Sequence, residues 1–199
     1  CLFGVLIRSH NITARSLWFD EAFSWRLVSF SYPEMIARAA ADVHPPLYYI
    51  LLKSWVYVFG TSLLALRMFS VVCAACSIAA GYLFTAYAFH ARRAGIYAAV
   101  LLALSPWVAS YAWEARMYPL GMIFAFLSSH ALLKAIREKS FGWSVAYALY
   151  ATALIYTHYL GLFTVIAQGL FAAGARVYAT RWSVGEIIQS RVFWGAILA

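Results

Sequence analysis

Residues 63–89, LLALRMFSVVCAACSIAAGYLFTAYAF, form an apolar run interrupted by a single charge, Arg67. A transmembrane helix needs about 20 mostly apolar residues, so this run is long enough to cross a bilayer. Composition extends the conclusion to the whole chain, because 65% of its residues are hydrophobic and 11% are charged. Soluble domains carry about 25% charged residues. The sequence therefore predicts an all-α, polytopic transmembrane helical bundle.

Apolar runs before and after this stretch set the expected organisation of the chain. Residues 1–7 are too short to cross and are interpreted as the tail of a first transmembrane helix, and residues 8–62 as a long outer loop with juxtamembrane helices. We expect 63–199 to hold about five full spans and the start of another near Ile187, and the chain to be a piece of a longer protein. The further full spans are expected at 95–112, 118–135, 143–157 and 160–178.

Basic residues orient this arrangement. They cluster at 92–93, 137–139 and 176–181, and the positive-inside rule places such clusters in the cytoplasm. The net charge is +8, but because the Lys and Arg residues sit in short clusters between apolar runs, as in cytoplasmic loops, we expect no nucleic-acid partner. The loop 8–62, the turn 113–117 and His158 then share the outer face of a multi-pass protein of the plasma (inner) membrane.

The outer loop contains the most polar sequence in the chain. Ser31, followed by Pro33 and Glu34, is typical of a helix start. The prolines that follow His44 favour an extended entry to a helix at 47–59. This helix is too short to span easily, and the orientation above requires that it lies in the membrane interface.

Two groups of charged residues stand out on this face. Asp20 and Glu21 are adjacent carboxylates in an aromatic setting, in a chain with only 7 acidic residues. Glu114 and Arg116 lie between two expected spans. An acidic pair near an acid and a cation is a candidate active site, although Glu114 and Arg116 are also consistent with an interfacial anchor.

Four segments carry a resemblance to a known family. In order along the chain they are LWFDEAFSW (17–25), HPPLYYILL (44–52), FGTSLLALRMFS (59–70) and SPWVASYAWEARMYPL (105–120). Together they resemble the bacterial relatives of protein O-mannosyltransferases, which are family 39-like glycosyltransferases of GT-C fold and include aminoarabinose transferases. The resemblance covers most of the chain.

The resemblance implies an activity. Such enzymes transfer a sugar from a polyprenyl-phosphate carrier to a hydroxyl of a protein, lipid or glycan acceptor on the outer face of the membrane. It also implies that the first outer loop holds the acidic pair and two helices parallel to the membrane. We expect an inverting reaction with membrane lipid as a partner and no cofactor, although two carboxylates could hold a divalent metal.

The chemistry assigns expected roles to individual residues. A base must accept the acceptor proton, and Asp20 is preferred, with Glu21 as the alternative or as a group that orients Asp20. The leaving phosphate needs cations or donors, for which Arg116 ranks first because arginine can bind phosphate through two parallel hydrogen bonds. The other expected substrate-binding residues are His44, Tyr48, Lys53, Glu114 and His158.

Several alternatives remain open at this stage. Lys53 is equally consistent with an interfacial side chain, and Arg67 is interpreted as a helix-end anchor. Cys73 and Cys76 match a redox or zinc spacing, but they lie within a span without further ligands, so neither role is expected. A transporter or channel that binds a cation or amine at the outer acidic pair is the main alternative function, and a non-catalytic scaffold is a third.

Overall fold

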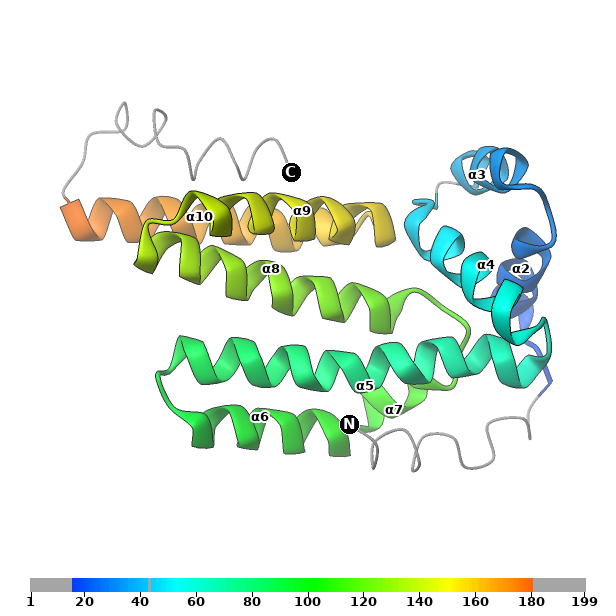
Figure 1. Cartoon of the computed structure of the whole chain (residues 1–199), viewed down its shortest axis with the longest axis horizontal. Coiled ribbons are helices and arrows are strands. Elements are labelled where there is room, and N and C mark those ends of the chain that lie inside the picture. Colours follow the sequence, from blue (N-terminus) through cyan, green and yellow to red (C-terminus); the bar gives the residue numbers. More distant parts are fainter. Residues whose placement is uncertain (1–15, 43, 181–199) are drawn as a thin grey trace.

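The computed structural model describes residues 16–42 and 44–180, and within them every regular element is a helix. One long helix, α5, runs along the molecule, with short helices packed across one of its ends and further helices beside it (Figure 1). The helices are α2 (Phe19–Val28), α3 (Tyr32–Ala41), α4 (Leu47–Phe59), α5 (Leu63–Ala88), α6 (Arg92–Leu104), α7 (Pro106–Ala112), α8 (Tyr118–Glu138), α9 (Phe141–Thr157) and α10 (Gly161–Thr180). The predicted all-α polytopic bundle is confirmed.

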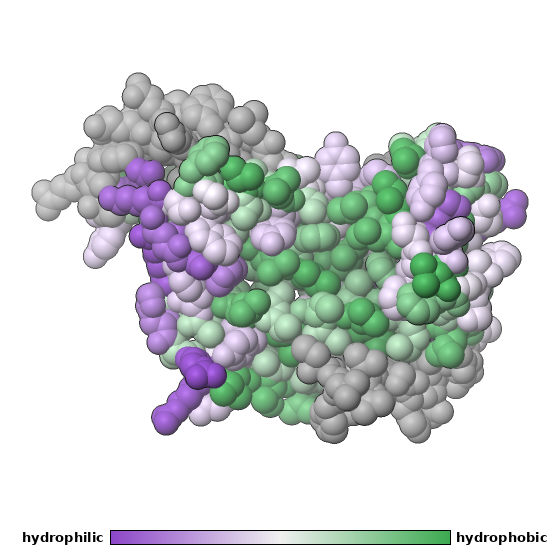
Figure 2. Space-filling model, viewed as in Figure 1, coloured by the Kyte–Doolittle hydropathy of each residue, from purple (hydrophilic) through white to green (hydrophobic). Residues whose placement is uncertain are grey.

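Three described helices are long and apolar enough to cross a membrane, namely α5, α8 and α10, and the pair α6–α7 adds a fourth if it is one span. The 17-residue α9 is not among them, so the number of crossings stays a prediction. Apolar residues cover the middle of the face shown in Figure 2, and hydrophilic residues gather toward its two ends. The expected helix tail at 1–7 and the span near Ile187 lie outside the described residues.

The expected span 95–112 is divided into two helices. α6 ends at Leu104, α7 begins at Pro106, and the two are bent by 58°. A proline disfavours helical geometry in the residue before it, and Ser105 accordingly has φ −63° and ψ 122°. The Ser105 hydroxyl accepts a hydrogen bond from the Val108 N–H at 3.4 Å and caps α7. The sequence Ser-Pro therefore restarts the helix in a new direction.

Helices α2, α3 and α4 pack across the N-terminal end of α5, and we call this the loop end of the molecule (Figure 1). The predicted start of α3 is confirmed, because the Ser31 hydroxyl accepts from the Glu34 N–H at 3.4 Å. The bounds of α4 agree with the predicted helix 47–59. Trp55 of α4 donates from Nε1 to the Ala65 carbonyl at 2.9 Å and ties α4 to the first turn of α5.

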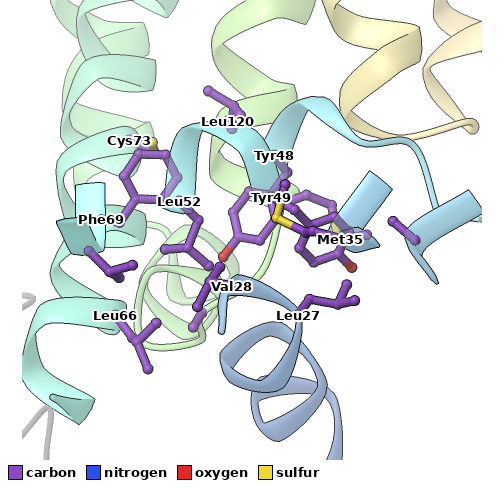
Figure 3. Packing of buried hydrophobic residues seen from close by; sticks show 14 residues of the cluster. Leu27, Val28, Met35, Tyr48, Tyr49, Leu52, Leu66, Phe69, Cys73 and Leu120 are labelled. Atoms are coloured by element: carbon purple, nitrogen blue, oxygen red, sulfur yellow. The ribbon is translucent and has the colours of Figure 1, made fainter. Parts of the chain in front are cut away.

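A dense apolar core holds the loop end together (Figure 3). Full burial of one large apolar side chain contributes about 1.5–3 kcal/mol, so this cluster fixes the short helices against α5. Its fully buried members, each at most 2% exposed, are Leu27, Met35, Ala39, Tyr48, Tyr49, Leu52, Leu66, Ala115 and Met117. They come from α2, α3, α4, α5 and the turn 113–117, which places that turn in the same assembly.

The opposite end of the bundle is formed by the C-terminal ends of α5 and α8 and the start of α6, and we call it the basic end. Arg137 donates from Nη1 to the Tyr87 carbonyl at 2.8 Å and from Nη2 to the Ala88 carbonyl at 2.9 Å. These are last-turn carbonyls of α5, which lack partners within their own helix. Gly95 lets α6 approach α5 here, because a Cβ at this position would lie 2.9 Å from the Tyr82 carbonyl oxygen.

Candidate functional site

The first turn of α2 places the acidic pair. Asp20 and Glu21 both lie in this turn, where unpaired backbone N–H groups and the helix dipole favour negative charge. Successive residues of a helix point about 100° apart, since a turn holds 3.6 residues. The two carboxylates therefore leave α2 in different directions and reach different surroundings.

Glu21 is completely buried, at 0% exposed. Its Oε1 accepts from Arg67 Nε at 2.8 Å and from the Ala115 N–H at 3.0 Å, and its Oε2 accepts from Arg67 Nη2 at 2.6 Å. A buried charge is tolerated when it is paired and hydrogen-bonded, and this carboxylate meets both conditions. Both Glu21 oxygens are thereby occupied by groups of the protein.

Arg67 corrects an expectation from the sequence. It was interpreted as a helix-end anchor, yet it is only 4% exposed and forms a two-pronged ion pair with Glu21. Arg67 Nη2 also donates to the Ser16 carbonyl at 3.1 Å. Arginine fits a carboxylate in this way because its planar guanidinium presents parallel donors. The pair joins α2 to α5, 46 residues further along the chain.

Asp20 occupies a more open position. Its side chain is 34% exposed, and Oδ2 lies 3.5 Å from Nη2 of Arg116. This separation makes an ion pair but exceeds the usual hydrogen-bond length of about 2.7–3.2 Å. Within the described residues, the Arg116 Nε has no hydrogen-bond partner although Arg116 is only 6% exposed. The site thus contains a carboxylate accessible to solvent and a buried cation with an unused donor.

The turn 113–117 brings Glu114 and Arg116 to this place. Its Ala115 N–H is held by Glu21, and the Arg116 N–H donates to the Glu114 carbonyl at 2.8 Å. Burial raises the pKa of Glu114, and the negative charges of Glu21 and Asp20 raise it further, while Arg116 opposes them. Glu114 is thus a third carboxyl group in the field of the acidic pair, and this field favours the protonated form of Glu114.

Two histidines complete the surroundings of Arg116. Burial lowers the pKa of His158, and the positive charges of His44 and Arg116 lower it further, so its imidazole is neutral at pH 7. His158 Nδ1 accepts from the Leu160 N–H at 3.1 Å, which leaves the proton on Nε2 as a donor. The His158 ring lies 5.7 Å from that of Tyr118. His44 binds Asp42, with 3.1 Å between Nδ1 and Oδ2.

Tyr48 and Lys53 occupy different positions on α4. Tyr48 is 1% exposed, and burial raises the pKa of its hydroxyl well above the ordinary value, while an interaction with the Ser70 side chain opposes this rise. Arg116 acts on the Tyr48 hydroxyl electrostatically. The Lys53 ammonium donates to the carbonyls of Val28 and Phe30 at 2.9 and 2.6 Å. Lys53 therefore fixes the C-terminal end of α2, and its expected part in substrate binding stays a prediction.

Sequence reasoning missed two partners of the acidic pair, Arg67 and the Ala115 N–H. The signal for Arg67 was present, because it is the only charge in residues 63–89 and an ionisable residue within a membrane helix is a functional candidate by default. No sequence signal identifies the backbone N–H. Cys73 and Cys76 are both free thiols, and the expectation that they form no redox or metal site stays a prediction.

A divalent metal was left open by the sequence. Among residues 16–42 and 44–180, no three His, Cys, Asp or Glu side chains group closely enough to hold a metal ion. The Arg116 guanidinium lies 3.5 Å from Asp20 and would compete with a metal ion for that carboxylate. Whether the protein uses a metal stays a prediction.

Comparison with known proteins bears on the function. A family model described as dolichyl-phosphate-mannose-protein mannosyltransferase matches residues 43–196. The chain belongs to this family. It is therefore a multi-pass membrane protein of the glycosyltransferase class, of mannosyltransferase type, and the predicted resemblance is confirmed. No curated protein and no solved structure matches it. The match begins after α2, so Asp20 and Glu21 lie outside it, whereas Arg67, Ala115 and Arg116 lie within it.

Proposed function

We propose that this mannosyltransferase-family protein moves a sugar from a polyprenyl-phosphate carrier to a hydroxyl of a protein, lipid or glycan acceptor, with inversion, at the outer face of the plasma membrane. The single observation that supports the proposal most is the contrast within the acidic pair. Glu21 is buried with both oxygens occupied, while Asp20 is partly exposed beside a buried arginine. Family membership favours this reading over a transporter or channel.

Asp20 is assigned as the general base. A base must reach the proton of an incoming hydroxyl, and only an accessible carboxylate oxygen can do so. Glu21 has no oxygen left for this purpose, so it is assigned as a positioning residue that holds the turn 113–117 through Ala115. Of the two residues of the acidic pair, the partly exposed Asp20 is therefore favoured as the base over the buried Glu21.

The reaction is written as a direct displacement. The acceptor oxygen attacks the anomeric carbon as Asp20 takes its proton, a new C–O bond forms, and the bond from that carbon to the phosphate oxygen breaks. The electron pair of the broken bond leaves with the polyprenyl phosphate. Arg116 is assigned to stabilise the charge that develops there, because its guanidinium is buried and has an unused donor.

The remaining residues have supporting roles in the proposal. His158 supplies a neutral Nε2–H donor near Arg116, and the charge of His44 helps to lower the pKa of His158. Burial raises the pKa of Glu114, so beside the two other carboxyl groups it keeps its proton to higher pH than an ordinary glutamate does. Tyr48 offers a buried hydroxyl on which Arg116 acts electrostatically.

The test compares sugar transfer by membranes that contain the protein, using a polyprenyl-phosphate mannose donor with a radiolabelled sugar. Asp20→Asn keeps the size of the side chain and removes the base, so transfer should fall by about 10²–10⁴-fold with the protein still folded. Glu21→Gln, the matched control, should instead lower the amount of folded protein. Undiminished transfer by Asp20→Asn would overturn the assignment of the base.

A further inference from the structure

A cleft lies between α2 and α3, toward the C-terminal end of α2. Its volume is about 410 Å³, and its wall combines apolar side chains with two guanidinium groups, one from each helix. Ligand sites commonly join an apolar wall to a few charged groups in this way. The lining residues are Phe23, Arg26, Leu27, Phe30, Arg38, Ala41 and Asp42.

Two arginines in the cleft share one aromatic ring. The Cζ atoms of Arg26 and Arg38 lie 4.9 and 4.1 Å from the centre of the Phe30 ring. Stacking fixes the guanidinium planes and leaves donors at their edges for a ligand. Arg38 also donates to Glu34 from Nε and Nη2. Within residues 16–42 and 44–180, the Arg26 guanidinium contacts the Phe30 ring and forms no ion pair with a carboxylate.

The charges that face the cleft favour an anion. Asp42 is the only carboxylate in its lining, and its Oδ2 is already 3.1 Å from His44 Nδ1. Glu34, the partner of Arg38, does not belong to the lining. Two like charges held on one ring repel each other, and a shared anion between them would remove that repulsion.

The cleft continues from the candidate active site along α2. Asp20, Phe23 and Leu27 are spaced three and four residues apart, so they share one face of α2, and Phe30 follows just beyond its C-terminal end. Arg26 follows Asp20 by six residues, which corresponds to about 9 Å along the helix axis at 1.5 Å per residue. The Phe23 ring lies 5.6 Å from the His44 ring and joins the two places.

We infer that this cleft binds a phosphate group of the acceptor, so that the acceptor is a phosphorylated sugar or a lipid that carries one. A phosphate fits the forked donors of arginine. A phosphate bound at Arg26, about 9 Å along α2 from Asp20, would let a hydroxyl of the same acceptor reach Asp20, the proposed base. The inference rests on the proposed function, since it concerns the acceptor of that reaction. The same phosphate chemistry is present in the headgroup of an anionic phospholipid, which the experiment must separate.

The experiment measures binding without turnover. The full-length protein is placed in phosphatidylcholine nanodiscs and titrated with glucosamine 1-phosphate or with glucosamine, and the heat of binding is recorded. The phosphorylated sugar should bind about tenfold more tightly, as expected for one charge-assisted contact. Arg26→Gln should remove this preference, Arg26→Lys should keep part of it, and Arg92→Gln, at the basic end, should leave it unchanged.

Three results would overturn the inference. One is equal binding of both sugars by the wild type, and another is an unchanged preference in Arg26→Gln. The third is a wild type that shows no preference between the two sugars but enriches phosphatidylglycerol from nanodiscs of mixed lipids, with the enrichment lost in Arg26→Gln. That result would assign the cleft to bulk lipid. Because no donor is present, a failure of the Asp20 mechanism leaves these binding results intact, and the two proposals are tested separately.

Discussion

Both ends of the helical bundle carry arginines, but the two ends use them differently. At the loop end, Arg67 and Arg116 are 4% and 6% exposed and face carboxylates. At the basic end, Arg92 and Arg93 are exposed, and Arg137 donates to backbone carbonyls of α5. An exposed arginine at a helix end serves as a topological anchor at small cost. A buried one must meet an anion, and it therefore marks the end that has specific chemistry.

The same contrast separates the two neighbouring acids. Glu21 belongs to the buried network, and its loss would remove the carboxylate that pairs with Arg67. Asp20 lies at the edge of that network, where solvent reaches it and Arg116 is 3.5 Å away. One carboxylate thus holds the loop end to α5, and the other is available for chemistry. Variants at each end of the bundle can therefore be ranked by how strongly they disturb the buried pairs.

The largest effect is expected at the Arg67–Glu21 pair. Arg67→Leu leaves the Glu21 carboxylate buried without its cation, which should reduce the free energy of unfolding by about 3–5 kcal/mol. Thermal unfolding of the purified protein in detergent, followed by tryptophan fluorescence, measures the loss. The double variant Glu21→Leu/Arg67→Leu removes both charges and should recover much of the stability. An Arg67→Leu protein that melts with the wild type would contradict the role of the pair.

Arg116→Lys should produce the next largest effect. Lysine keeps the charge but loses the flat fork that fits phosphate, so we expect a 10-fold to 100-fold fall in transfer, equal to about 1.4–2.7 kcal/mol. The loss should appear with the polyprenyl-phosphate donor at all acceptor concentrations. Steady-state kinetics with the donor varied checks this. Arg137→Lys is the matched control at the basic end, and an equal loss there would show that the effect is not local.

Much of the fold followed from the sequence, because span length and apolar content are read directly. Residues 47–59 were correctly bounded by the Pro-Pro entry and by Gly60. α2 was not predicted as a helix from its residues, since apolar side chains at Phe19, Phe23 and Val28 are mixed with polar ones on several faces. The bend at Ser105 was present in the sequence as Ser-Pro, but it was read as part of one span.

The candidate site followed from the sequence only in outline. Scarcity of charge singled out Asp20, Glu21, Glu114 and Arg116, and the structure places Asp20 beside Arg116. Which acid is buried depends on how α2 is rotated against α5, and a single sequence does not specify that rotation. The partnership of Glu21 with Arg67 spans 46 residues, so it depends on tertiary packing rather than on any local pattern.

At the basic end, Arg137→Gln should have a modest effect. Its two hydrogen bonds cap the last carbonyls of α5, and loss of such contacts at an exposed helix end costs about 1 kcal/mol. The same thermal unfolding assay should show a small decrease in melting temperature, with transfer per folded molecule unchanged. A decrease as large as that of Arg67→Leu would remove the distinction between the two ends.

The smallest expected effect is a change in pH dependence at Glu114. Burial, followed by the charge of Glu21, raises the pKa of Glu114 above its usual value, so the folded protein keeps this proton to higher pH than the unfolded chain. Where the folded state binds more protons, stability falls as pH rises. The stabilising contribution is therefore complete below the usual pKa and is lost as pH rises through the raised one.

Glu114→Gln tests this sign, because glutamine resembles the protonated acid and does not titrate. The variant and the wild type should melt together at pH 4, and the variant should melt slightly higher at pH 7, with the gap opening through the raised pKa. Melting temperatures measured across this range in one buffer series decide the matter. A variant that melts lower than the wild type at pH 7 would mean that the effect of Arg116 on the pKa of Glu114 outweighs that of burial. Glu114 would then belong with Glu21 among the stabilising ion pairs, and the buried network at the loop end would be larger.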